Sequence, residues 1–104
     1  MNDTLQMTML YDFYGDLLTE KQREYFNLYH NEDYSLSEIA EIANISKPGV
    51  YDIITRAEKT LTQTELKTGI VQKWLETRAA LEQSYPNTGD LHTAILSYFQ
   101  LEKN

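Results

Sequence analysis

SLSEIAEIANISKPGVYDIIT, residues 35–55, is the stretch that decides the fold. Ser35 and Glu38 have the spacing of a capping box, in which each side chain bonds an amide at the start of a helix. A short helix is therefore predicted over residues 36–43. Its small Ala40 would let a second helix approach closely, and three- and four-residue spacing puts further apolar residues on one face: Ile39, Ile42 and Ala43.

A turn and a second helix follow. Asn44 tolerates the left-handed conformation that ends a helix, and Ile45 is expected to plug the corner. Ser46 can cap the next helix, whose first turn accommodates Pro48 because amides there lack an intrahelical partner. The buried stripe of that helix is predicted to contain Val50, Ile53, Ile54 and Ala57. The joint spacing favours a helix-turn-helix over a pair of core helices in another bundle.

The remaining sequence is also helical in pattern. Apolar residues recur at helical spacing over 5–18, and Thr19 with Gln22 forms a second capping box for a helix ending near residue 30. Helical character continues after the motif. Residues 62–64 and Gly69 are weak helix formers that would allow a bend, and a boundary is expected near residue 63. A loop at 85–89 precedes a last helix capped by Asp90. We predict an all-α protein of five or six helices.

Two parts are expected on this basis. Residues 1–61 would form the helix-turn-helix domain with its N-terminal helix, and residues 62–104 a helical extension. The extension carries an apolar stripe at residues 66, 70, 74 and 81, which must be covered by the last helix or by a second copy of the chain. Helix-turn-helix proteins often dimerise through helices appended to the motif, so a homodimer is predicted.

Composition limits the function classes. The 104 residues lack cysteine, an apolar run of membrane-spanning length and a signal-peptide pattern, so a cytoplasmic protein without membrane insertion is expected. The formal net charge is −7, and residues 1–34 hold 7 acidic against 2 basic residues. Because nucleic acids are polyanions, any binding to them should be weak, salt-sensitive and confined to a local patch.

No catalytic constellation is evident. His30 and His92 are isolated from ligands at metal spacing and are expected at surfaces or helix ends, and the four glycines do not form a phosphate loop. We therefore expect neither enzymatic activity nor a cofactor. Five tyrosines between residues 11 and 34 are expected to pack the core; the alternative is a stacking platform for RNA bases.

The candidate nucleic-acid site lies on the second helix of the motif, at the positions that packing does not use. Three cations there could neutralise phosphates, and three polar side chains could bond backbone or base edges. The six residues are Lys47, Arg56, Lys59, Ser46, Tyr51 and Thr55. Asp52 does not fit this set, because a carboxylate repels phosphates.

The sequence also resembles the YlxM-like family of small bacterial helix-turn-helix proteins over about residues 9–61. The segments that carry the likeness are LYDFY (10–14), LTEKQR (18–23), EDYSLSEIA (32–40), VYD (50–52) and RAEK (56–59). The resemblance implies an all-helical fold similar to region four of bacterial sigma factors. It also implies a regulatory or accessory role in the signal recognition particle pathway. The sequence departs from the family pattern at Gly49, Ile53 and Thr55, where alanine, asparagine and lysine are common.

Two hypotheses follow for the function. The first is non-catalytic binding of DNA or RNA through the second helix of the motif. The second is an acidic adaptor that binds a basic partner, such as the GTPase of the signal recognition particle, with the motif serving only as a scaffold. Asp12 and Asp16, one helical turn apart, would then contact the partner.

Overall fold

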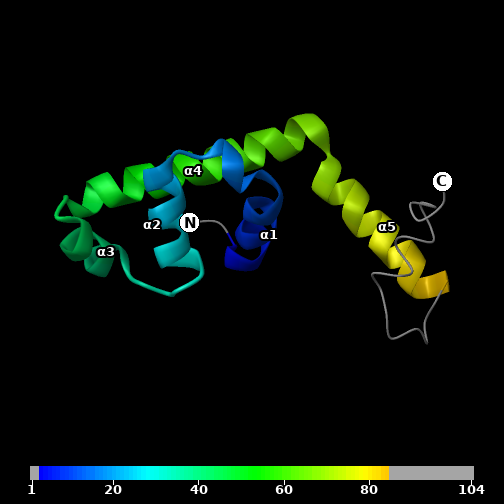
Figure 1. Ribbon diagram of the computed structural model, residues 1–104, viewed down its shortest axis with the longest axis horizontal. Helices are drawn as coiled ribbons and strands as arrows, with labels where there is room; N and C mark the ends of the chain where they lie inside the picture. Colours follow the sequence, from blue (N-terminus) through cyan, green and yellow to red (C-terminus); the bar gives the residue numbers. More distant parts are fainter. Residues whose placement is uncertain (1–2, 85–104) are drawn as a thin grey trace. The chain divides into compact units, whose positions relative to one another are not determined.

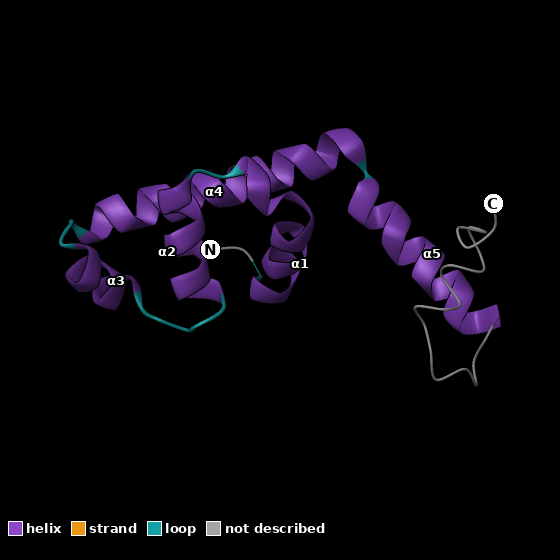
Figure 2. Cartoon of the chain, viewed as in Figure 1, coloured by secondary structure: helices purple, strands orange, loops and turns teal. Residues whose placement is uncertain are grey.

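The computed structural model describes residues 3–84, and every regular element in that range is helical (Figure 2). This confirms the all-α prediction for the described part of the chain. There are five α-helices and one short 3₁₀ turn: α1 (Thr4–Tyr14), η1 (Gly15–Leu17), α2 (Glu20–His30), α3 (Leu36–Ala43), α4 (Lys47–Thr68) and α5 (Ile70–Ser84). None of the described helices is long and apolar enough to cross a membrane.

The chain divides into two compact units between Thr68 and Gly69. Gly69 has a φ of +64°, a left-handed conformation that ends α4 and that glycine adopts without strain. The helix break predicted near residue 63 is therefore wrong. Weak helix formers at 62–64 stay helical because Leu61 beside them is completely buried and the Thr64 hydroxyl donates to the Thr60 carbonyl.

α4 organises the first unit, and α1, α2 and α3 all pack against it (Figure 1). Around the helix-turn-helix the core contains Tyr25 from α2, Ile39 from α3, and Val50 and Ile54 from α4. Ile53 is only partly buried at the edge of this cluster. The predicted contact between the two motif helices is thus confirmed, and α2 completes the three-helix core.

The stretch over residues 5–18 is not one helix. α1 stops at Tyr14, and the η1 turn redirects the chain toward α2. Leu5 and Leu17 are consequently exposed, whereas Tyr14 is buried and its hydroxyl donates to Glu65 Oε1 of α4 at 2.6 Å. α1 buries Leu10 and Tyr14 of the predicted apolar stripe, but the chain reversal leaves Phe13 partly outside the core as well.

The capping boxes at Thr19 and Ser35 form as predicted. At the second one, Glu38 N donates to Ser35 Oγ at 3.0 Å and Ser35 N donates to Glu38 Oε1 at 2.9 Å. The hydrogen bond from the Ser35 amide lowers the pKa of the Glu38 carboxyl below its ordinary value. Asn44 adopts the predicted left-handed conformation with a φ of 57°, and the Gly49 amide donates to the capping Ser46 hydroxyl.

Two apolar residues of the motif lie elsewhere than expected. Ile39 is 0% exposed, but Ile42 is 59% exposed and does not share its buried face. Ile45 is 37% exposed, so it closes the corner only in part. α3 is just two turns long and contacts α2 and α4 on one side. The Ile42 side chain lies on another side of α3 and is therefore outside the core.

A buried polar chain links three helices of the first unit. His30 Nε2 lies 2.7 Å from Glu58 Oε2, and His30 Nδ1 lies 2.9 Å from the Thr4 hydroxyl. The His30 and Glu58 side chains are 0% and 3% exposed. His30 ends α2, as the helix-end expectation has it, but it does not lie at the surface, because its side chain is buried against Glu58. His92, the loop at 85–89 and the helix predicted after Asp90 lie outside the described residues.

Tyrosines fill the core on both sides of α2. Tyr25 is buried, and the ring of Tyr11 stacks on Phe26 with centroids 4.9 Å apart. The Tyr11 hydroxyl accepts a hydrogen bond from the Asn27 side chain at 2.9 Å. These rings are used in packing, which supports the core interpretation over a base-stacking platform.

Candidate nucleic-acid interface

The six residues predicted for nucleic-acid contact lie on α4 and at the residue before it, but they do not form one site. Ser46 and Lys47 lie at the N-terminal end of the helix, where the Ser46 hydroxyl is already engaged as the cap. Lys47 is exposed and can still reach a phosphate. Tyr51, one turn further on, is 50% exposed. This end of α4 therefore presents one cation and one aromatic side chain with a hydroxyl.

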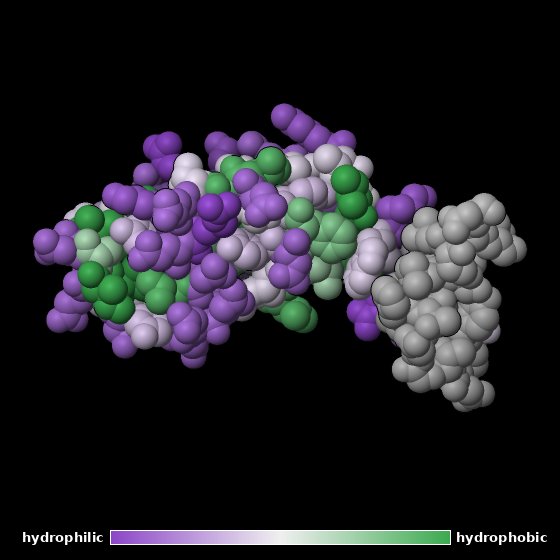
Figure 3. Space-filling view, in the orientation of Figure 1, coloured by the Kyte–Doolittle hydropathy of each residue, from purple (hydrophilic) through white to green (hydrophobic). Residues whose placement is uncertain are grey.

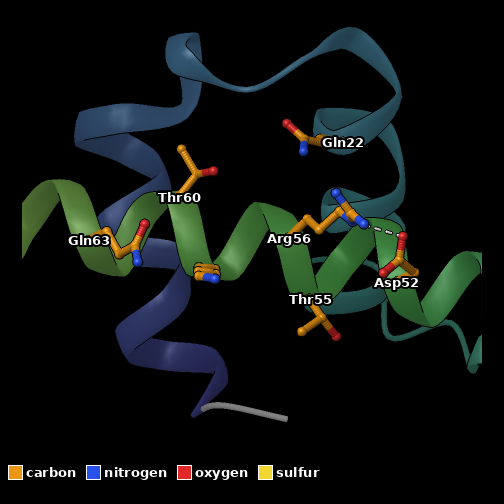
Figure 4. A pocket seen from close by; sticks show the side chains of 7 residues that line it. Gln22, Asp52, Thr55, Arg56, Thr60 and Gln63 are labelled. Atoms are coloured by element: carbon orange, nitrogen blue, oxygen red, sulfur yellow. Dashed lines mark hydrogen bonds and ion pairs between the residues drawn. The ribbon is translucent and has the colours of Figure 1, made fainter.

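The other three residues line an open groove in the middle of α4, with a volume of about 550 Å³. We call it the α4 groove. Figure 4 shows that its side chains project from α4 and from the first turn of α2, which carries Gln22. The groove is lined by Gln22, Asp52, Thr55, Arg56, Lys59, Thr60 and Gln63. Its lining combines amides and hydroxyls with two cations and one carboxylate, a set of groups suited to hydrogen bonding with a polar anion.

Asp52 and Arg56 form an ion pair within α4, one helical turn apart. Arg56 Nε donates to Asp52 Oδ2 at 2.9 Å, and the side chains are 72% and 60% exposed (Figure 4). The pair explains the presence of a carboxylate among the predicted phosphate-binding residues, because Asp52 orients the Arg56 side chain. It also offsets the positive charge of Arg56, which leaves Lys59 as the unpaired cation among the described residues that line the groove.

Thr55 lines the α4 groove beside Arg56, but its side chain is half-buried. Its hydroxyl oxygen is inaccessible and lacks a hydrogen-bond partner among residues 3–84. A group in that position is poorly placed to read a base edge.

Sequence reasoning missed three of the groove residues: Gln22, Thr60 and Gln63. The spacing of Arg56, Thr60 and Gln63 along one helix face could have suggested the last two. Gln22 could not have been found this way, because it belongs to a different helix and its capping role explained it already.

Asp12 and Asp16, the residues predicted for partner contact, are both exposed. Asp12 lies on α1 and Asp16 in the η1 turn. In residues 3–84 neither takes part in an ion pair, and that part of the chain has no cluster of three or more residues able to hold a metal ion.

Comparison with known proteins places this helix-turn-helix in a family. Residues 1–94 match the family described as "Putative helix-turn-helix protein, YlxM / p13 like". The chain belongs to the UPF0122 family. This confirms the resemblance found in residues 9–61 and extends it to most of the sequence.

Relatives in the UPF0122 family are similar over most of their length. The chain is 54% identical over 82 residues to a UPF0122 protein of Caldanaerobacter subterraneus, covering 79% of this chain and 70% of the relative. It is 47% identical over 83 residues to one of Geobacillus kaustophilus, covering 80% and 76%. A UPF0122 protein of Anoxybacillus flavithermus is 40% identical over 109 residues, covering 98% of this chain and 99% of the relative.

Proposed function

We propose that this protein is a non-catalytic, cytoplasmic regulatory or accessory factor that binds DNA or RNA through α4, acting in the signal recognition particle pathway. The observation that carries the proposal is a helix-turn-helix whose α4 exposes three cations to solvent, Lys47, Arg56 and Lys59. Three cations neutralise few phosphates, so the binding is weak and falls steeply with salt. A homodimer formed through residues 62–104 would set the spacing of two α4 helices on the nucleic acid.

The ion pair between Asp52 and Arg56 allows a test in both directions. Replacing Lys59 or Arg56 with alanine should lower the affinity for a labelled DNA duplex or structured RNA and reduce the salt slope by about 1. Asp52→Asn should raise the affinity, since it removes a carboxylate from the groove and frees the Arg56 guanidinium for the ligand. Fluorescence anisotropy at two or more salt concentrations measures both effects.

Lys67→Ala provides the matched control, because Lys67 is an exposed cation of α4 outside the groove. It should change the affinity less than Lys59→Ala does. An affinity that stays the same in Arg56→Ala, Lys59→Ala and Asp52→Asn would remove the α4 groove from the binding site.

A second candidate function is favoured by the distribution of charge. Residues 1–34 hold 7 of the 16 acidic residues and only 2 bases, and Asp12 and Asp16 are exposed. An acidic surface of this kind attracts a basic protein more readily than it attracts a nucleic acid. In this alternative the protein is an adaptor for a signal recognition particle GTPase, and the helix-turn-helix serves as its scaffold.

Charge reversal tests the adaptor directly. The double variant Asp12→Lys/Asp16→Lys should abolish co-purification with the GTPase, because it turns two attractive contacts into repulsive ones. Glu20→Lys/Glu24→Lys on α2 is the matched control, as it makes the same change of net charge at exposed positions. The pull-down is run with and without nuclease. Retention of the complex by the first variant, or its loss on nuclease treatment alone, would count against the adaptor.

A further inference from the structure

α3 presents an apolar groove to solvent on the side that does not face the core. The groove has a volume of about 340 Å³ and is lined by Tyr34, Glu38, Glu41 and Ile42. We call it the α3 groove. Ile42 is 59% exposed within it, and the Tyr34 ring forms a half-buried wall that also packs against the core cluster. Both residues therefore offer apolar surface that the fold leaves partly uncovered.

The exposure of Ile42 is not needed to build the motif. Ile39 already fills the core at 0% exposed, so a polar residue at position 42 would serve α3 equally well. Ile45, in the turn after the helix, adds a further side chain that is 37% exposed. Apolar side chains are accordingly visible at the surface over α3 in Figure 3. Apolar surface of this kind, rimmed by charged groups, is typical of an interaction site.

The charged side chains at the rim of the groove are all acidic. Residues 34–46 contain Glu38 and Glu41 and lack lysine and arginine. Across residues 3–84 neither glutamate is part of an ion pair. The Glu38 carboxyl stays ionised to lower pH than usual because its hydrogen bond with Ser35 lowers its pKa. The groove thus combines an apolar floor with two carboxylates that have no cation of their own.

We propose that the α3 groove docks a basic amphipathic helix of a partner protein. An aliphatic or aromatic side chain of that helix would cover Ile42 and Tyr34, while flanking lysines or arginines pair with Glu38 and Glu41. The same carboxylates repel phosphate groups, which makes a nucleic acid the wrong occupant. The proposal depends on neither function proposed above, because α4 and the Asp12 and Asp16 positions are separate from this groove.

The probe is a synthetic amphipathic helix with leucines on one face and lysines and arginines beside them, titrated into the full chain. Ile42→Ser should weaken its binding about tenfold, because the variant removes the apolar floor. Glu41→Lys should weaken the binding several-fold, since one attractive charge becomes repulsive. The affinity of this variant should also fall less steeply with salt than that of the unaltered chain. Binding is measured by isothermal titration calorimetry, and amide chemical shifts of α3 report where the peptide lies.

Matched variants separate a specific groove from general attraction to an acidic protein. Leu17→Ser removes an apolar residue outside the groove that is 60% exposed, close to the 59% of Ile42, and Glu24→Lys makes the same charge change on α2. Both should bind the peptide like the unaltered chain. Equal losses in Glu24→Lys and Glu41→Lys would overturn the proposal, as would unchanged binding by Ile42→Ser. Dimerisation of the free chain that Ile42→Ser abolishes in sedimentation velocity would assign the groove to a second copy and overturn it too.

Discussion

Replacing Glu58 with alanine is expected to destabilise the first unit by about 3–5 kcal/mol. The Glu58 carboxylate contacts His30 Nε2 at 2.7 Å in a core where both side chains are at least 97% buried. The substitution leaves the imidazole without its partner and opens a cavity against α2. Burial of an unpaired polar or charged group has a large energetic cost because water cannot replace the lost partner.

Glu58→Gln is the matched variant, since the amide keeps the shape and one acceptor oxygen; it should cost less than Glu58→Ala. A double-mutant cycle with His30→Ala should show a coupling free energy of about 0.5–3 kcal/mol, because removing both partners leaves neither one stranded. Urea unfolding followed by circular dichroism measures the free energies of unfolding of the four proteins in the cycle and of Glu58→Gln. A loss of less than about 1 kcal/mol in Glu58→Ala would show that the pair contributes little to stability.

Ile39→Ala is the second substitution with a large expected effect, at about 2–5 kcal/mol. Ile39 is 0% exposed and packs in the cluster with Tyr25, Val50 and Ile54, so its removal leaves a cavity where three helices meet. Ile42→Ala, on the same helix, is the matched control. Because Ile42 is 59% exposed, its truncation should change the free energy of unfolding by no more than about 0.5 kcal/mol.

The two isoleucine variants are compared by the midpoint and slope of urea unfolding. An unchanged slope ensures that the difference in midpoint reflects stability rather than compactness. If Ile42→Ala destabilised the protein as much as Ile39→Ala, both residues would have to be buried, which would also remove the α3 groove as a docking surface.

The local signals in the sequence were reliable wherever neighbouring residues decide the outcome. Both capping boxes, the left-handed Asn44 and the Ser46 cap depend on groups within three or four residues, and each forms as predicted. The helix-turn-helix could therefore be predicted, and the candidate cations on α4 with it. The charge distribution could be counted directly, although it does not by itself choose between a nucleic acid and a protein as ligand.

Contacts between distant residues could not be read in this way. The sequence suggests no partner for His30, because Glu58 lies on another helix and is matched to it only when α2 packs on α4. Gln22 joins Arg56 and Lys59 in the α4 groove for the same reason. The ion pair of Asp52 with Arg56 is a local exception. Its four-residue spacing is visible in the sequence, but the sequence analysis considered Asp52 only for its repulsion of phosphates and not as a partner of Arg56.

The caps, the turn residue and the helical spacing together thus determined that residues 35–55 form two helices joined by a tight turn, since caps and turns are satisfied by near neighbours. Only the tertiary structure decided which apolar side chains those helices bury. Ile39 and Ile42 are the same residue type, three positions apart on one helix. Ile39 is nevertheless buried in the core, whereas Ile42 lies in the open α3 groove. Burial depends on which side α2 and α4 cover, and that choice is made by residues remote in sequence.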